Sequence, residues 1–347
     1  MTQIMKPEVS VCIPTFNRAY ILRNVIQSVL SQTYMRFELI VSDDASSDDT
    51  ETVVKNINDS RIRYHRNEVN LGLSNNWNIV VRNANGKYVF KLDDDDYIAP
   101  TFLEKIVYLF KKYPNIGSAY TGFYYARGYS GDWIEKVVDK TMFKGDYIRG
   151  IDYVRSYLLR TSIPGFHPSS VVFRYDLAKE IGFYEKAKND LMFSLALASK
   201  ADVGYVPEPL FYYVQHEKAR ATYITERGGS DFRVFEPTKL IKDFFSIDFI
   251  RTIPDLMEIE DIVLRRERIA RSVMYLFMSR KSFRLRDYFR LSVYLIKKDR
   301  KLLMVPLFVS SLIVCFLVPR RLVENVSYMY KSNPVFLKIF GMIFRRN

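Results

Sequence analysis

The first 120 residues alternate between short apolar runs and segments with helical periodicity. The predicted strands occupy residues 9–13, 37–41, 62–65 and 88–92, and all but the short one at 62–65 are mainly apolar. Between these strands, apolar positions recur at helical spacing over residues 21–30, and further helices are expected after the polar turn at 42–50, ending at residue 57, and over residues 74–83. Strand and helix therefore alternate with short connections, a pattern that predicts an α/β domain with a doubly wound, Rossmann-like and mostly parallel sheet flanked by helices.

The alternation becomes less regular after this point. Pro100 suits the first turn of a helix over residues 102–110, which Pro114 must end. Residues 123–168 mix aromatic, polar and glycine residues without a clear period. Further strands are expected at residues 116–120, 170–173 and 203–206.

The composition is that of a globular protein with a substantial core. Of 347 residues, 48% are hydrophobic and 26% are charged, which excludes a disordered, collagen-like or coiled-coil chain. Cys12 and Cys315 are the two cysteines, too few for a disulfide framework or a cysteine metal site. The first apolar stretch is broken by Ser10 and Pro14 and does not have the pattern of a signal peptide. These features favour a reducing, cytoplasmic location.

The formal net charge of +13 is concentrated toward the C-terminus. Residues 262–347 contain 19 basic and 4 acidic side chains, a net charge of +15. Residues 302–318 form an uncharged run of 17 residues with basic residues on both sides. As a helix this run would extend about 25 Å, less than the ~30 Å hydrocarbon core of a bilayer. We therefore expect this segment to lie on a membrane surface, with its cations at anionic headgroups, rather than to span it.

We expect two parts, an α/β domain over residues 1–230 and a basic, apolar and helical region over residues 231–347, which contains the positively charged stretch 262–347. The alternative for the second region is a helical bundle that packs on the first domain or joins two copies in a homo-oligomer. Nucleic-acid binding is disfavoured, because the positive charge alternates with long aliphatic runs instead of lining a polar surface.

Polar residues follow three of the predicted strands. Asn17 and Arg18 follow the first strand, Asp43 and Asp44 follow the second, and the four aspartates Asp93–Asp96 follow the fourth. Ligands of open parallel sheets bind beyond the carboxyl ends of the strands, so we expect these side chains to converge. Adjacent carboxylates repel one another, which makes a divalent cation their natural partner. Oxygen ligands without nearby cysteine or histidine favour Mg²⁺ or Mn²⁺ over zinc.

Other sites of this kind do not fit the sequence. An EF-hand loop starting at Asp93 would need a glycine where Ile98 stands. Neither a G-x-x-x-x-G-K-[ST] loop nor a G-x-G-x-x-G turn follows an early strand, which disfavours P-loop hydrolysis and dinucleotide redox chemistry.

The chain resembles the nucleotide-sugar domain of glycosyltransferase family 2 in four ordered segments: VSVCIPTFNR, FELIVSDDASSDDT, NLG and YVFKLDDDDYIAP. The resemblance covers residues 8–215. It implies the GT-A fold, a metal ion bound through a D-x-D element to the diphosphate of a nucleotide sugar, and sugar transfer with inversion of the anomeric centre.

The resemblance also implies roles for individual residues. It makes Asp95 the metal ligand, although the choice among the four aspartates stays open, and it makes His216 a second candidate near the diphosphate or metal. His167 lies where family members often contact the acceptor, and Trp77 stands where many relatives have an arginine. The nucleotide site would be lined by Pro14, Thr15, Asn17, Asp44, Asp93 and Asp94.

A carboxylate must accept the proton of the acceptor hydroxyl, whose pKa is far above neutral. Family members carry an acidic pair at the start of a helix, and the segment FYEKAKNDLMFSLAL resembles it, with Asn189 in the first position and Asp190 in the second. Asp190 is therefore the expected catalytic base. The alternative is that Asp190 only caps the helix, and Glu185 is a reserve candidate for the base.

Together these expectations describe a metal-dependent inverting glycosyltransferase, held on the inner face of the cell membrane, that takes part in cell-surface polysaccharide synthesis. Its partners would be a nucleoside-diphosphate sugar and a glycan acceptor linked to a polyprenyl diphosphate. Two alternatives remain: transfer to a protein or soluble glycan, and a catalytically inert scaffold that binds nucleotide sugars.

Overall fold

The structure is a computed structural model that describes residues 6–127, 132–137, 143, 145–158, 167–187, 189–215 and 250. All of these residues belong to the first of the two units into which the chain divides, residues 1–256. The predicted domain boundary at residue 230, the C-terminal region and His216 lie outside the described residues, so these expectations stay predictions.

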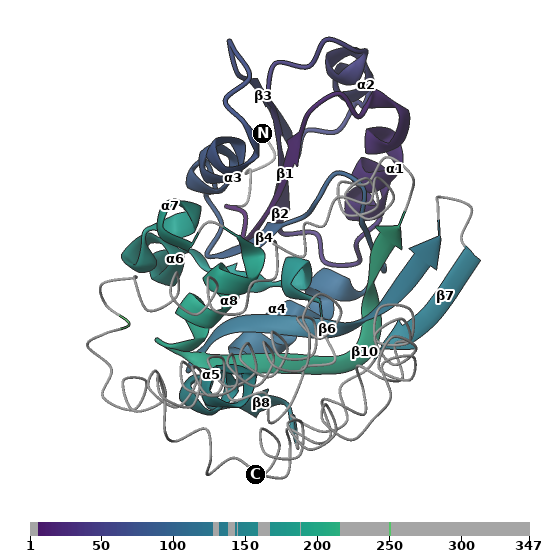
Figure 1. The fold of residues 1–347 in the computed structure, drawn as a ribbon. Helices are drawn as coiled ribbons and strands as arrows, with labels where there is room; N and C mark the ends of the chain where they lie inside the picture. The colour runs from purple at the N-terminus through teal and green to yellow at the C-terminus, as the bar shows by residue number, and fades with distance from the viewer. Residues whose placement is uncertain are drawn as a thin grey trace, which may run out of the picture. The chain divides into compact units, whose positions relative to one another are not determined.

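The strands of the described part form one sheet of ten strands (Figure 1). Its main path has the order β3-β2-β1-β4-β9-β6-β10-β5, with β7 paired to β6 and β8 paired to β10. The bounds are β1 Val9–Thr15, β2 Phe37–Asp43, β3 Ile62–Arg66, β4 Tyr88–Lys91, β5 Tyr97–Ile98, β6 Ile116–Arg127, β7 Asp132–Val137, β8 Tyr147–Ile148, β9 Val172–Arg174 and β10 Asp202–Gln215.

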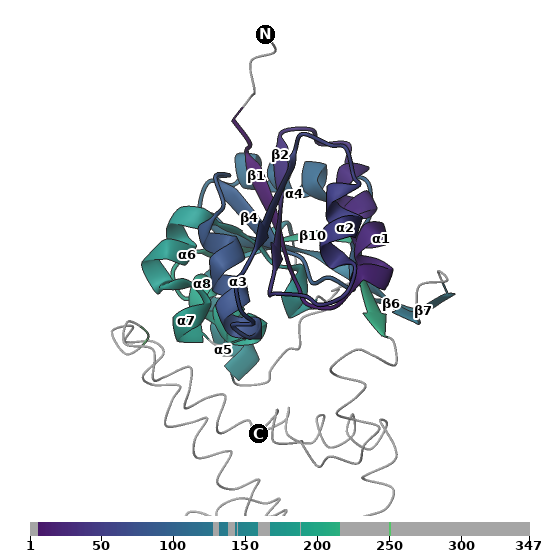
Figure 2. The same ribbon diagram turned by 90° about the horizontal axis from the view of Figure 1, so that it is seen from above.

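Helices cover both faces of this sheet (Figures 1 and 2). In Figure 2, α1 and α2 lie on one face, and α3 lies on the other face together with α6, α7 and α8. The bounds are α1 Ala19–Leu30, α2 Thr50–Lys55, α3 Leu73–Arg82, α4 Phe102–Lys112, α5 Gly150–Leu158, α6 Tyr175–Ile181, α7 Phe183–Ala187 and α8 Asp190–Ala198, with a short 3₁₀ turn over Pro168–Ser170. The layered α/β architecture expected from the sequence is confirmed.

The first half of the sheet is parallel, as predicted. β1 pairs in parallel with β2 and β4, and β2 pairs in parallel with β3. β1, β2 and β4 are buried along their whole length, which is typical of parallel strands covered by helices, whereas β3 at the edge of the sheet is partly exposed. Because the strands share one direction, the segments that follow β1, β2 and β4 meet at a single edge of the sheet.

The second half of the sheet is mixed. β9 is antiparallel to both β4 and β6, and β5 and β8 are antiparallel to β10. β6 and β10 are parallel to each other and extend beyond the runs predicted at 116–120 and 203–206. Their extensions pair aromatic residues in register, and the rings of Tyr124 and Tyr212 stack with centroids 5.3 Å apart. Such cross-strand pairs stabilise a sheet, but they have no apolar periodicity that marks a strand in advance.

Glu38 is a buried carboxylate on β2 that connects three segments. Its Oε1 accepts hydrogen bonds from the Ser10 hydroxyl at 2.6 Å and from the Asn85 backbone N–H at 2.7 Å, and its Oε2 accepts one from Arg63 at 2.7 Å. Burial acts to raise the pKa of Glu38, but hydrogen bonds from Ser10, Arg63 and Asn85 outweigh it and hold the pKa below its usual value.

At Gly86 the chain passes so close to β1 that a Cβ would lie 2.6 Å from the nitrogen of Ser10.

Glu38→Gln should destabilise the protein more at neutral pH than in acid. A group whose folded pKa is lowered contributes stability above its unfolded pKa, about 4.5 here, and loses that contribution as the pH falls through the folded value. We expect the free energy of unfolding to fall by ~1–3 kcal/mol at neutral pH and the difference from wild type to narrow in acid. Denaturant titrations measure both, with the exposed Glu68→Gln as the control. A difference that does not change with pH would contradict the role of the Glu38 charge.

None of the helices in the described part of the chain is long and apolar enough to cross a bilayer. The apolar run at residues 302–318 lies outside that part.

Candidate functional site

The four aspartates lie at the edge of the sheet where the parallel strands end. The Leu92 backbone N–H donates to the Cys12 carbonyl at 2.9 Å, so the chain leaves β4 alongside β1. Asp96 is buried, and its Oδ1 accepts a hydrogen bond from the backbone N–H of Val214 on β10 at 2.9 Å. The other members of Asp93–Asp96 are partly exposed, so three carboxylates remain accessible at this edge.

Two of these carboxylates face Arg18, which follows β1. Arg18 Nε lies 3.9 Å from Asp94 Oδ1, and Nη2 lies 3.7 Å from Asp95 Oδ2. Burial raises the pKa of Asp94 to about 7, with Asp95 adding to the rise and Arg18 opposing it. Burial and the neighbouring Asp95 together outweigh Arg18, and a bound cation would be stabilised beside these carboxylates.

The oxygen donors at this edge fit Mn²⁺ or Mg²⁺ held by one or two carboxylates together with substrate phosphates. Over the described ranges, no three His, Cys, Asp or Glu side chains come together in an arrangement that could hold a metal. Mg²⁺ commonly binds through one or two carboxylates, with substrate phosphates and water as its other ligands. Asp94 and Asp95 can supply such carboxylates. A metal at this place would need a diphosphate to complete its ligands.

Lys91 links the aspartate cluster to Asp190, a residue from much later in the chain. Lys91, the last residue of β4, is fully buried, and its Nζ donates to Asp93 Oδ1 at 2.7 Å and to Asp190 Oδ2 at 3.2 Å. Burial raises the pKa of Asp93 to about 6, with Lys91 opposing the rise and Asp190 adding to it. One ammonium group thus joins the aspartate cluster to the expected base.

Asp190 is the first residue of α8 and is not its cap. The side chain of Asn189 caps the helix by accepting a hydrogen bond from the Met192 backbone N–H at 2.9 Å. The alternative that Asp190 serves as the N-cap is therefore wrong, because the preceding asparagine takes that role. The Asp190 carboxylate is left to face Lys91 and the hydroxyl of Ser169, which lies 3.4 Å from Asp190 Oδ2.

His167 lies near this carboxylate, just before the 3₁₀ turn Pro168–Ser170. Its Nδ1 accepts a hydrogen bond from the Ser169 backbone N–H at 3.3 Å, and its ring stacks on Tyr213 with centroids 4.1 Å apart. Burial lowers the pKa of His167 to about 4, so the ring is neutral near pH 7. Ser169 therefore connects His167 to Asp190, which places the expected acceptor residue beside the expected base.

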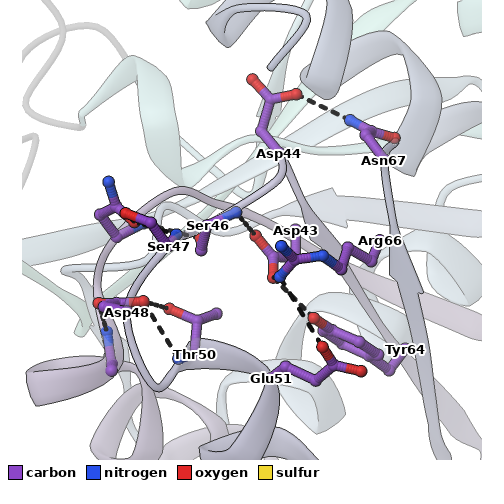
Figure 3. Close-up of polar contacts among 12 residues, drawn as sticks. Asp43, Asp44, Ser46, Ser47, Asp48, Thr50, Glu51, Tyr64, Arg66 and Asn67 are labelled. Carbon is purple, nitrogen blue, oxygen red and sulfur yellow. Dashed lines mark hydrogen bonds and ion pairs between the residues drawn. The ribbon is translucent and has the colours of Figure 1, made fainter. Parts of the chain in front are cut away.

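The loops after β1 and β2 are joined by hydrogen bonds (Figure 3). The Asn17 backbone N–H donates to the Ser46 hydroxyl at 2.9 Å, and Asn17 Oδ1 accepts from the Ser47 backbone N–H at 2.8 Å. Asn17 has a positive φ of 54°, a conformation that asparagine tolerates better than most residues. Pro14 and Thr15 end β1 directly before this loop and are buried.

Asp44 shapes the loop between β3 and α3. Its Oδ1 accepts hydrogen bonds from the Asn67 side chain at 2.8 Å and the Leu71 backbone N–H at 2.9 Å, and its Oδ2 accepts one from the Gly72 N–H at 2.9 Å. Figure 3 shows the Asp44 carboxylate turned toward Asn67. The structure thus gives Asp44 a loop-holding role that the sequence did not indicate, beside its predicted place in the nucleotide site.

Lys91 is a candidate functional residue that the sequence pattern did not single out. The available signal was a lysine at the end of the otherwise apolar strand YVFK, directly before the aspartates. Its Nζ lies 4.0 Å from the ring centroid of Trp77, the residue found in place of an arginine. The reserve base, Glu185, is exposed and bonds Arg82 at 2.6 Å.

The sequence also matches known proteins. The glycosyl transferase family 2 model matches residues 10–182. A Campylobacter jejuni protein, GalNAc(5)-diNAcBac-PP-undecaprenol beta-1,3-glucosyltransferase, is 45% identical over 93 residues, which are 26% of this chain and 30% of the relative. The Escherichia coli protein WfaP, UDP-Glc:alpha-D-GlcNAc-diphosphoundecaprenol beta-1,3-glucosyltransferase, is 33% identical over 116 residues, 33% of this chain and 46% of the relative. The chain thus spans less than half of either relative's length.

A solved structure shares the fold. The mannosyltransferase PcManGT from Pyrobaculum calidifontis, determined in complex with GDP-Man and Mn²⁺, superposes with a TM-score of 0.53 at 17% sequence identity. The similarity covers 94% of this chain and 88% of that structure. At this identity the similarity supports the fold alone.

Proposed function

This chain belongs to glycosyltransferase family 2, and from that premise we propose that it transfers a sugar from a nucleoside-diphosphate sugar to a hydroxyl group of a glycan acceptor. The observation that carries the proposal is the shared lysine: Lys91 binds Asp93 of the aspartate cluster and also Asp190, 99 residues later in the chain. A donor-side carboxylate and a candidate base are thereby held within one ion-paired group.

The donor would bind at the edge formed by the loops after β1, β2 and β4. The nucleotide-binding site would be lined by Pro14, Thr15, Asn17, Asp44, Asp93 and Asp94. Asp95 would ligate Mn²⁺ or Mg²⁺, and His216 is a second candidate ligand. When bound, the cation supplies positive charge to the two phosphates as negative charge develops on the leaving group. Arg18, near Asp94 and Asp95, adds a positive charge on the same side.

The chemical step is an exchange of one C–O bond for another. The acceptor oxygen forms a bond to the anomeric carbon while the bond from that carbon to the diphosphate oxygen breaks on the opposite face, so the configuration inverts. Asp190 accepts the proton of the acceptor hydroxyl, and the nucleoside diphosphate leaves with the bonding electrons. We propose that the ring of His167, neutral near pH 7, contacts the incoming acceptor sugar without adding charge.

For the acceptor, we propose a glycan linked to a polyprenyl diphosphate in cell-surface polysaccharide synthesis. This is the acceptor class in the names of the Campylobacter jejuni and Escherichia coli relatives. A second Escherichia coli relative, WfgD, carries the same UDP-Glc and diphosphoundecaprenol description and is 40% identical over 88 residues.

A screen of donors and acceptors tests this function. The protein would be incubated with UDP-, GDP- and TDP-linked sugars, with Mn²⁺, with Mg²⁺ and with chelator, and with a synthetic GlcNAc-diphosphate lipid as acceptor. We expect metal-dependent formation of a glycosylated lipid from one donor. Transfer to a water-soluble oligosaccharide but not to the lipid would contradict the acceptor class. Nucleotide binding without transfer or donor hydrolysis would instead indicate an inert binding protein.

The C-terminal region supplies a second test, because we propose that residues 231–347 hold the enzyme on the inner face of the membrane. Each Lys or Arg near an anionic surface contributes ~1 kcal/mol, an attraction that salt screens. Full-length protein should therefore sediment with phosphatidylglycerol vesicles, and high salt should release only part of it, because the apolar run at 302–318 adds a salt-resistant component. Vesicles of phosphatidylcholine alone are the control. If the protein sediments with neither vesicle type, residues 231–347 would instead have a packing or oligomerising role.

A further inference from the structure

The ammonium group of Lys91 is buried between two carboxylates from distant parts of the chain. Its Nζ lies 2.7 Å from Asp93 Oδ1 and 3.1 Å from Asp190 Oδ1, and no part of its side chain is exposed. Burial by itself would lower the pKa of Lys91, but Asp190 and Asp93 outweigh it and raise the pKa, so the group is charged. A charged lysine inside a fold is retained only where its partners are well placed.

Aromatic rings from three helices define where this ammonium group lies. Its Nζ is 4.0 Å from the centroid of the Trp77 ring on α3 and 6.0 Å from that of Tyr184 on α7. Tyr184 meets the edge of Trp77 at 5.2 Å and stacks on Phe193 of α8 at 4.2 Å. A cation over an aromatic face is attracted by the ring, most strongly over tryptophan. The lysine is therefore held from the ring side as well as from the carboxylate side.

Lys91 directly contacts the Asp190 carboxylate. Asn189 provides the helix cap, so the Asp190 carboxylate is not fixed by the helix terminus. Its contacts at Oδ2 are Lys91 Nζ at 3.2 Å and the Ser169 hydroxyl at 3.4 Å. Because the same Nζ bonds Asp93 at the donor side, Lys91 determines how far the base lies from the donor-side carboxylate.

We infer that Lys91 is a positioning residue for sugar transfer: it fixes the Asp190 carboxylate against Asp93 so that the base faces the acceptor hydroxyl beside the bound donor. The inference rests on the proposed role of Asp190. Lys91 takes up no proton and forms no bond to substrate in the reaction. Trp77 completes the arrangement by holding the ammonium group in place.

Kinetics of Lys91→Gln test this inference. Glutamine keeps a hydrogen-bond donor but removes the charge. With UDP-glucose and a GlcNAc-diphosphate lipid as substrates, we expect kcat to fall ~10²-fold, the loss expected for a misplaced catalytic group. UDP binding, measured by calorimetry, should change much less than kcat. Lys91→Arg, which keeps the charge, should recover part of kcat. A wild-type kcat in Lys91→Gln, together with a large loss of kcat in Asp190→Asn, would overturn the inference and leave the proposed function intact.

A double-mutant cycle separates positioning from a merely structural role. If Lys91 acts through Asp190, the variant with both Lys91→Gln and Asp190→Asn should transfer at about the rate of Asp190→Asn alone, because residues that act as a unit are not additive. Rates that fall by the product of the two single effects would show that Lys91 acts independently of Asp190. Trp77→Leu is the second variant, because it leaves all three charges in place and should still lower kcat.

A spectroscopic measurement tests the same coupling without activity. The chain contains two tryptophans, so Trp133→Phe leaves Trp77 as the single reporter. In that background, Asp190→Asn should change the emission of Trp77 by displacing the ammonium group over its ring. The same substitution should have much less effect when Lys91→Gln is already present. Emission that responds equally in both backgrounds, or in neither, would contradict the connection from Asp190 through Lys91 to Trp77.

Discussion

Asp190→Asn should lower the rate of sugar transfer by ~10²-fold or more, because asparagine keeps the shape of the side chain but cannot accept the proton of the acceptor hydroxyl. Asn189 caps α8, so the substitution leaves the helix terminus unchanged. Binding of the nucleoside diphosphate should persist, because Asp190 is not among the residues proposed to line the nucleotide site. Initial rates of transfer and calorimetry of UDP binding measure the two effects separately.

The matched control for this substitution is Glu185→Gln. Glu185 precedes α8 by a few residues in the chain, but its carboxylate is exposed and pairs with Arg82 at 2.6 Å. Its loss should change transfer by less than about twofold, in line with surface substitutions away from a site. Transfer near the wild-type rate in Asp190→Asn, or a large loss of transfer rate in Glu185→Gln, would show that another residue is the base.

Asp95→Ala should abolish the part of nucleotide binding that depends on metal. In wild-type protein, UDP or GDP at about one hundred times its dissociation constant should raise the free energy of unfolding by ~2.7 kcal/mol, and Mn²⁺ should be needed for most of this gain. Removing one carboxylate next to Asp94 takes away a hard oxygen ligand and relieves the repulsion that favours a cation. Thermal unfolding with each nucleotide, with and without Mn²⁺ or Mg²⁺, makes the measurement.

The control for this prediction is Asp176→Asn on α6. Asp176 is an aspartate of the same sheet domain, and its carboxylate pairs with Arg174 away from the four aspartates. It should keep the full metal-dependent stabilisation. If Asp95→Ala keeps that stabilisation as well, the metal is bound elsewhere, with Asp94 and His216 the next residues to test.

The elements of the first half of the domain could be predicted closely from the sequence. The runs at 9–13, 37–41, 62–65 and 88–92 became β1 to β4, with ends that moved by two residues or fewer. β1, β2 and β4 are buried throughout, so each one shows in the chain as a mainly apolar run, whereas β3 at the sheet edge is partly exposed. The position of the four aspartates at the carboxyl edge followed from the same pattern, because parallel strands share one direction.

The second half was harder to predict because its strands depend on partners that are distant in the chain. β9 lies between β4 and β6 and is antiparallel to both, although its residues follow β6 by more than forty positions in the sequence. The extended ends of β6 and β10 are stabilised by aromatic pairs across the two strands, and neither strand shows this pairing by itself.

The site divides in the same way. The sequence by itself determined that Asp93–Asp96 follow a buried strand and that Asp190 begins a helix, since both are local features of burial and turn formation. Only the tertiary structure decided that Asn189 is the cap, that Asp44 holds the loop after β3, and that Lys91 joins Asp93 to Asp190 across 99 residues. The physical reason is that an ion pair or a cap depends on which side chains the sheet register and helix packing bring within about 3 Å, and hydrophobic periodicity carries no record of those distances.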